Sequence, residues 1–138
     1  MGYEDTLASV PLFSGLDKSD LARLAKSVVA RSYSKGEAIV KEGEQAVAFY
    51  VIVSGKAEVQ KGSETIATLG AGEPVGDMAL LDGYPRSTSV ISAEDGTQCL
   101  VMTRWDFMAE LNTNPSIALT MLPVLSKRIR RLEGEDVR

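Results

Sequence analysis

The sequence predicts a mainly β fold, a barrel or roll of short strands with helices at both ends of the chain. The central part alternates short β-branched or aromatic runs with glycines, which is typical of all-β sandwiches and barrels. The segments before and after it carry apolar residues at helical spacing. A chain of 138 residues can bury one hydrophobic core, and we expect a single domain over residues 1–138.

Residues 1–30 are expected to be helical. Apolar residues from Leu21 to Val28 recur at helical spacing in KSDLARLAKSVVA. Asp17 or Ser19 is expected to cap this helix, because the side-chain oxygen of such a residue accepts a hydrogen bond from a free backbone N–H of the first turn.

Residues 31–102 are expected to form the strands, in runs such as AFYVIVSGKAEVQKG and STSVISAEDG. Glycines separate these runs. Gly55, in VSGKAEV, is predicted to lie in a hairpin turn, because glycine adopts positive φ without steric cost.

Residues 103–133 are expected to form a pair of helices. TRWDFMAELNTNP predicts a short helix with Thr103 as its N-cap, and SIALTMLPVLSKRIRRLE predicts a longer one. Pro123 lies inside the longer pattern and predicts a kink or a late helix start.

An apolar stripe runs along the longer helix, with residues spaced as in a coiled coil. Its members are Ala118, Leu122, Leu125, Ile129 and Leu132. The pattern is too short to decide between two interpretations. Either the stripe packs on the barrel, or it forms a homodimer through the C-terminal helix.

Composition excludes several classes of protein. The chain contains no histidine, which excludes a Ser-His-Asp or Cys-His catalytic site and the usual zinc sites, so we expect neither an enzyme nor a metal site. The net charge of −4 argues against nucleic-acid binding. No apolar run is long enough to span a membrane, and a single cysteine, Cys99, predicts a reducing cytoplasm.

The stretch GDMALLDGYPRSTSV, residues 76–90, combines groups that suit a small anionic ligand. The run DMALL predicts one helical turn whose free N–H groups attract an anion, and Gly76 lets a ligand approach the backbone. Arg86 can bind a phosphate through two hydrogen bonds, and Ser87 can add a third. The carboxylate of Asp77 only accepts hydrogen bonds, which suits a sugar hydroxyl. Together these groups match a phosphorylated ribose.

Two plainer interpretations of the same residues stay open. Asp77 can be an ordinary helix N-cap. Arg86 can be a surface residue or can pair with Asp82.

GDMALLDGYPRSTSV resembles the phosphate-binding cassette of cyclic nucleotide-binding domains. That pattern is Gly-Glu, a short apolar helical turn, a variable gap, then Arg-Ser or Arg-Thr, Ala and a β-branched strand. LASVPLFSGLDKSDLARLA, GEAIVKEGEQAVAFYVIVSGKAEV and NPSIALTMLPVLSKRIRRLE resemble the leading helices, first strands and long helix of the catabolite activator and fumarate-nitrate regulator superfamily. The resemblance covers residues 7–133. It implies a β-roll, that is, a double-stranded β-helix or jelly-roll barrel, with N-terminal helices and a C-terminal helix pair.

The resemblance also implies a role for each residue of the site. Arg86 would neutralise the cyclic phosphate, with hydrogen bonds from Ser87 and from the backbone of residues 78–80. Asp77 would accept the ribose 2′-hydroxyl, and three apolar residues of the strands would enclose the ligand. The expected ligand-binding residues are Gly76, Asp77, Met78, Ala79, Leu80, Arg86, Ser87, Thr88, Val59, Ile66 and Val75.

The implied function is a non-enzymatic sensor that binds cyclic AMP or cyclic GMP and transmits binding to its C-terminal helix. Ser87 rather than Thr favours cyclic AMP, and no other cofactor is implied. Asp77 stands where the family has Glu, and Thr88 where it prefers Ala. These departures keep open an interaction or scaffold domain that no longer binds nucleotide.

The output of such a sensor would be a fused domain or a partner protein. Nothing after residue 133 is expected to form a helix-turn-helix. A further alternative is therefore the effector domain of a transcription regulator without its DNA-binding part.

Overall fold

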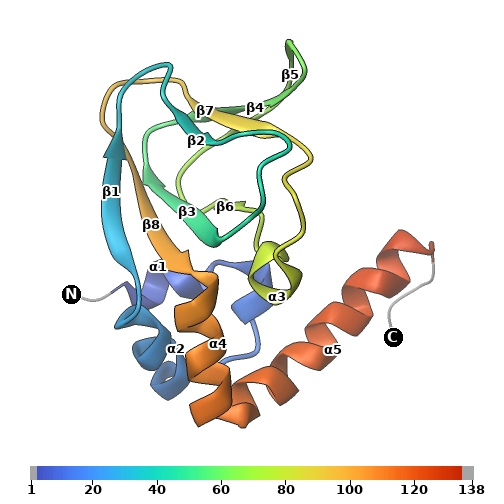
Figure 1. Ribbon diagram of the computed structural model, residues 1–138. Coiled ribbons are helices and arrows are strands. Elements are labelled where there is room, and N and C mark those ends of the chain that lie inside the picture. Colours follow the sequence, from blue (N-terminus) through green and yellow to red (C-terminus); the bar gives the residue numbers. More distant parts are fainter. Residues whose placement is uncertain (1–2, 135–138) are drawn as a thin grey trace.

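The computed structural model describes residues 3–134, in which two antiparallel sheets form a roll and the helices gather at one end of it (Figure 1). Residues 1, 2 and 135–138 of the expected domain lie outside this range. The predicted mainly β class with helices at both ends is confirmed. None of the helices in residues 3–134 has the length and apolar character needed to cross a membrane.

Each sheet has four strands, in the orders β1-β8-β3-β6 and β2-β7-β4-β5. The strands are β1 (Val29–Tyr33), β2 (Ala38–Val40), β3 (Ala48–Ser54), β4 (Ala57–Lys61), β5 (Glu64–Leu69), β6 (Pro74–Val75), β7 (Ser89–Ser92) and β8 (Thr97–Thr103). The first strand begins at Val29 rather than at residue 31, because β-branched Val29 already pairs with Val101 of β8.

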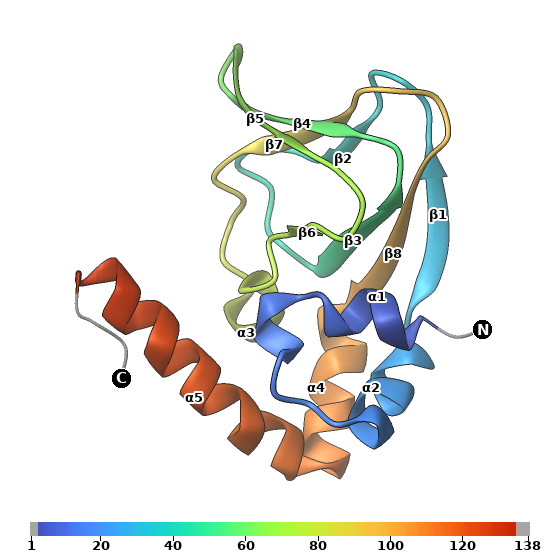
Figure 2. The same cartoon turned by 180° about the vertical axis from the view of Figure 1, so that it is seen from behind.

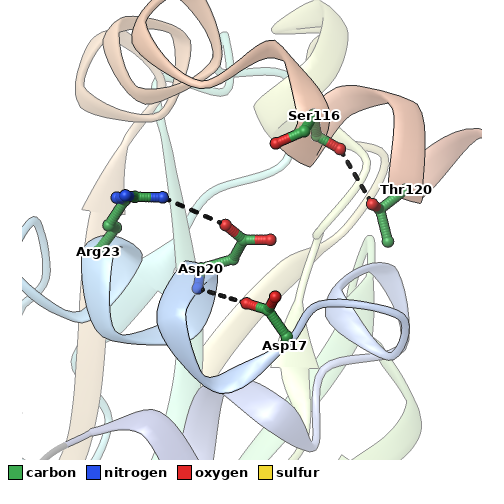
Figure 3. Close-up of polar contacts among 5 residues, drawn as sticks. All are labelled: Asp17, Asp20, Arg23, Ser116 and Thr120. Atoms are coloured by element: carbon green, nitrogen blue, oxygen red, sulfur yellow. Dashed lines mark hydrogen bonds and ion pairs between the residues drawn. The ribbon is translucent and has the colours of Figure 1, made fainter.

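The helices are α1 (Glu4–Ala8), the 3₁₀ helix η1 (Pro11–Phe13), α2 (Lys18–Ala25), α3 (Ala79–Asp82), α4 (Arg104–Thr113) and α5 (Pro115–Leu132). Asp17 caps α2, since its Oδ1 accepts a hydrogen bond from the backbone N–H of Asp20 at 2.9 Å (Figure 3). Thr103 caps α4 through the N–H of Asp106 at 3.2 Å. The predicted cap at Thr103 is confirmed, and of the two candidates for α2 the cap is Asp17 rather than Ser19.

The loop before α2 lies against the start of α5. A Cβ at Gly15 would lie 3.0 Å from the methyl group of Thr120, so the missing side chain permits this close contact. The Thr120 hydroxyl itself donates to the backbone oxygen of Ser116 one turn earlier, at 2.9 Å (Figure 3). The N-terminal helices thereby support the first half of α5.

The prediction of a hairpin at Gly55 is wrong, because β3 and β4 belong to different sheets. Gly55 has a φ of 92°, and a Cβ there would lie 2.6 Å from Oγ1 and 2.8 Å from Cα of Thr97. The glycine thus forms a corner, where the chain crosses closely over β8 as it passes from one sheet to the other.

Apolar side chains form two cores. The larger one lies between the sheet β1-β8-β3-β6 and the helices. There the ring of Phe13 packs edge-on against Phe49, with ring centres 5.9 Å apart, and also contacts Phe107, with ring centres 6.1 Å apart. The smaller one fills the roll and includes Ile52 and Cys99. The larger core fixes the helices in relation to the sheet.

Helix α5 runs through Pro123 without a late start and buries Ile117 and Met121 in its first half. The predicted stripe does not pack on the barrel along its whole length. Leu122 is 57% exposed and Ile129 is 55% exposed, and Leu132 is still more open. Figure 2 shows why: the second half of α5 extends away from the roll.

Candidate functional site

The helical turn that the sequence predicts at residues 77–81 is α3, which begins two residues later and spans Ala79–Asp82. Gly76 follows β6 directly and has a φ of 66°, and its carbonyl oxygen accepts the N–H of Ala79 at 3.0 Å. Gly83 closes the turn in the left-handed region with a φ of 65°. The fully buried side chain of Leu80 anchors the turn in the larger core. The backbone of this turn is therefore fixed on the side that faces the larger core, while its opposite side stays open.

Arg86 follows α3 in a loop that backbone hydrogen bonds attach to residues 43 and 44. Its backbone N–H donates to the oxygen of Glu44, and its own oxygen accepts from the N–H of Gly43, each at 2.8 Å. Its Nη2 donates to the backbone oxygen of Ala48, and its Cζ lies 5.8 Å from the centre of the Tyr50 ring. The side chain thus points inward toward β3.

The charge of Arg86 is half-buried, and no ion pair among the described residues includes it. Burial lowers the pKa of the guanidinium, which nevertheless stays protonated at neutral pH. Within residues 3–134, none of the ion pairs gives Arg86 a carboxylate partner. Its neighbours, a carbonyl oxygen and an aromatic ring, are attractive but carry no net negative charge.

A cleft of about 290 Å³ opens beside Arg86. It is lined by Gly76, Met78, Ala79, Asp82, Tyr84, Pro85, Arg86 and Ser87. The structure therefore brings together five of the predicted residues around one space. Asp82, Tyr84 and Pro85 were not predicted, and the only signal for them in the sequence was their position inside the same motif.

The other predicted residues lie outside this cleft. Leu80 faces the core, so only its backbone can contribute, and Thr88 is half-buried beyond Ser87. Val75 belongs to the core of the roll, and Val59 packs against it. Ile66 is exposed on β5. Their contact with a ligand stays a prediction.

Asp77 does not cap the helical turn, so the N-cap interpretation is wrong. Its carboxylate instead accepts two hydrogen bonds from Arg128 of α5, at 3.0 and 3.3 Å. Arg86 and Asp82 also form no ion pair. Oδ1 of Asp82 accepts the N–H of Tyr84 at 3.0 Å instead. Asp77, just before the turn, thus binds α5, while Asp82 at the end of the turn lines the cleft.

The hairpin of β4 and β5 closes over the loop that follows Arg86. Lys61 donates to the backbone oxygen of Ser87 at 2.8 Å and pairs with Glu42 at 3.3 Å. The N–H of Gly62 and the nearby Lys61 lower the pKa of Glu42. No local pattern in the sequence points to Lys61, Ala48 or Tyr50, because each contacts residues 86–87 only after the strands have folded.

Comparison with known proteins identifies relatives over nearly the whole chain. The family model "Cyclic nucleotide-binding domain" matches residues 30–114. A cAMP-dependent protein kinase regulatory subunit of Mycosarcoma maydis is 40% identical over 66% of this chain and 18% of its own length. The Cyclic AMP receptor protein of Thermus thermophilus is 34% identical over 91% of this chain and 60% of its own. The chain therefore spans less than two thirds of these curated relatives.

A solved structure, the N-terminal domain of a transcriptional regulator from Streptomyces coelicolor A3(2), superposes with a TM-score of 0.87 at 25% identity. The match covers 97% of this chain and 99% of that one. The roll and its flanking helices are thus shared as one unit.

Proposed function

This chain belongs to the cyclic nucleotide-binding domain family, and we propose on that basis that it is a regulatory module that binds cyclic AMP and passes the signal to α5. One observation carries the proposal: the half-buried guanidinium of Arg86 faces the cleft with no carboxylate partner in residues 3–134. A cyclic phosphate would supply the missing negative charge, and hydrogen bonds between such charged groups are the strong ones.

The cleft offers further groups for the phosphate. The hydroxyl of Ser87 and the N–H groups of the α3 turn lie beside Arg86. Because the N–H groups of Ala79 and Leu80 already bond to the oxygens of residues 76 and 77, a phosphate would share them. The cleft volume of about 290 Å³ is near the lower end of the roughly 300–1,000 Å³ found for small-molecule sites.

Cyclic AMP is proposed ahead of cyclic GMP on one ground. Ser87 stands at the position where serine rather than threonine favours cyclic AMP in the resemblance described above. The names of relatives do not favour either nucleotide, because they include both cAMP-dependent and cGMP-dependent protein kinases.

Transmission to α5 would pass through Asp77. A ribose hydroxyl that bonds to this carboxylate would compete with Arg128 or share the acceptor with it, and either change acts on the contact between the turn and α5. Ligand binding would then shift the population of α5 positions. The output would be a further domain or a partner protein.

Calorimetric titration tests the binding proposal. We expect cyclic AMP to release or absorb heat with the unchanged protein and to bind more tightly than cyclic GMP. Arg86→Ala should abolish the heat, whereas Arg23→Ala, which removes an exposed cation from α2, should not change it. Absence of heat with both nucleotides at high concentration would favour the scaffold alternative instead.

Spin labels test transmission. Labels on exposed Glu94→Cys in the roll and Glu133→Cys after α5 should change their separation when cyclic AMP is added. In an Asp77→Ala variant that still binds, the change should be smaller. An identical distance distribution with and without ligand contradicts the transmission proposal.

We also propose that the exposed stripe of α5 pairs with a second copy of the chain. Its members keep coiled-coil spacing while Leu122 and Ile129 remain more than half exposed, so a second copy of the same stripe would cover them. Ile129→Arg should convert a dimer into a monomer in light scattering. Leu119→Arg, at a leucine outside the stripe that is 65% exposed, should leave the dimer intact. If the protein without substitutions is already a monomer in light scattering, this pairing is contradicted.

A further inference from the structure

The guanidinium of Arg86 is enclosed on three sides by backbone and ring. Nη2 donates to the oxygen of Ala48, and the Tyr50 ring lies under Cζ at 5.8 Å. On the third side, a Cβ at Gly76 would overlap Nη1, so the absence of a side chain there makes room for the guanidinium. The cleft is the fourth side.

One pair of strands supplies these neighbours. Ala48 and Tyr50 both belong to β3, and Tyr50 pairs across the sheet with Val75, the residue directly before Gly76. The ring and the glycine therefore reach Arg86 from adjacent strands that fix their relative positions.

Arg86 separates two spaces. It lines the open cleft together with Ser87, and it also lines a second pocket of about 80 Å³ together with Tyr50, beside exposed residues such as Lys41 and Glu44. Tyr50 is not among the residues that line the cleft, so the ring leaves the cleft side of the guanidinium for a ligand.

We propose that Tyr50 is a positioning residue for Arg86, a role that rests on the proposed function of Arg86 in binding a cyclic phosphate. A long arginine side chain loses rotamer entropy when a ligand fixes it. A cation held over an aromatic face within about 6 Å is attracted by the ring quadrupole. The ring thereby holds the guanidinium in place before the ligand arrives, which favours affinity through preorganisation.

The test is a series of residues at position 50 that differ in ring electronics but little in shape. Tyr50→Phe should keep the affinity for cyclic AMP close to that of the unchanged protein. Phenylalanines with one, two and three fluorines should weaken binding progressively, because fluorine withdraws electrons from the ring face. Tyr50→Leu should weaken it by roughly 2- to 30-fold, the range expected for loss of a cation–π contact.

A spectroscopic signature separates positioning from simple packing. In the ligand-free protein, the Arg86 side-chain N–H resonance should show a ring-current shift that Tyr50→Phe retains and Tyr50→Leu removes. Arg86→Ala assigns the resonance. The fluorinated series preserves the shape of the core, so it remains informative if Tyr50→Leu fails to fold.

Failure of this inference is distinguishable from failure of the proposed function. Affinity that is insensitive to fluorination, in a protein whose cyclic AMP binding is abolished by Arg86→Ala, overturns only the role of Tyr50. Binding that survives Arg86→Ala overturns the role of Arg86 itself.

Discussion

The carboxylate of Asp77 and the guanidinium of Arg128 form a two-bond ion pair, although 51 residues separate them in the chain. Their side chains are only 12% and 27% exposed. This contact joins the turn that borders the cleft to the second half of α5, which otherwise extends away from the domain (Figure 1).

Loss of one partner from this pair should destabilise the protein. Arg128→Met leaves the Asp77 carboxylate buried without its hydrogen-bond donors, which costs about 1–3 kcal/mol of unfolding free energy. Adding Asp77→Asn to the variant should recover part of that loss. Urea unfolding at neutral pH measures both. The control Arg23→Met, in an exposed pair, should cost about 1 kcal/mol or less.

Gly76→Ala should weaken cyclic AMP binding, because the new Cβ displaces the guanidinium of Arg86. Gly62→Ala is a matched control. Its φ of 61° is close to the 66° of Gly76, but a Cβ there meets nothing within 4 Å. Both variants carry similar backbone strain, so calorimetric titration isolates the effect on Arg86. Equal affinity in the two variants would contradict the contact.

Gly55→Ala should destabilise the roll more than Gly36→Ala. Both glycines have φ near 90°, so both substitutions introduce strain, of order 1–3 kcal/mol. Only at Gly55 does the Cβ also collide with the backbone of Thr97. Thermal unfolding should therefore give a lower Tm for Gly55→Ala, and equal Tm values would exclude the corner contact.

Cys99 should resist thiol reagents in the folded protein. Burial raises the pKa of its thiol to about 11, so almost no reactive thiolate forms at pH 8. Reaction with a chromogenic disulfide should be slow in buffer and fast in denaturant. The rate in buffer should rise with pH toward that pKa. A rapid reaction of the native protein at pH 8 would show that the thiol is accessible.

Local patterns in the sequence predict much of the fold and part of the site. The caps at Thr103 and at Asp17, one of two candidates for α2, are short-range features that were predicted correctly. The helical turn is also a short-range feature, and it was predicted two residues too early. Gly55 was assigned to a hairpin because its own conformation fits one. Whether the flanking strands pair with each other depends on the sheet order, which neighbouring residues do not encode.

The same limit applies to the site. Motif chemistry grouped Gly76, Arg86 and Ser87, which are close in sequence and share one cleft. The partner of Asp77 came from α5, and the support for Arg86 came from β3. Such contacts depend on tertiary packing, so only the structure identified them.

The end of α5 lies far from the buried residues that fix the helix to the core. The first half of α5 is held by the core through the buried side chains of Ile117 and Met121. Beyond them, Leu125 packs against the same core and Arg128 pairs with Asp77 of the α3 turn. The helix continues from Met121 to Leu132, a length of about 16 Å at roughly 1.5 Å per residue. A rotation of about 10° around Met121 would therefore displace Leu132 by about 3 Å. In the proposed transmission, a shift at the contact between Asp77 and Arg128 would therefore become larger at Leu132, which lies farther from Met121.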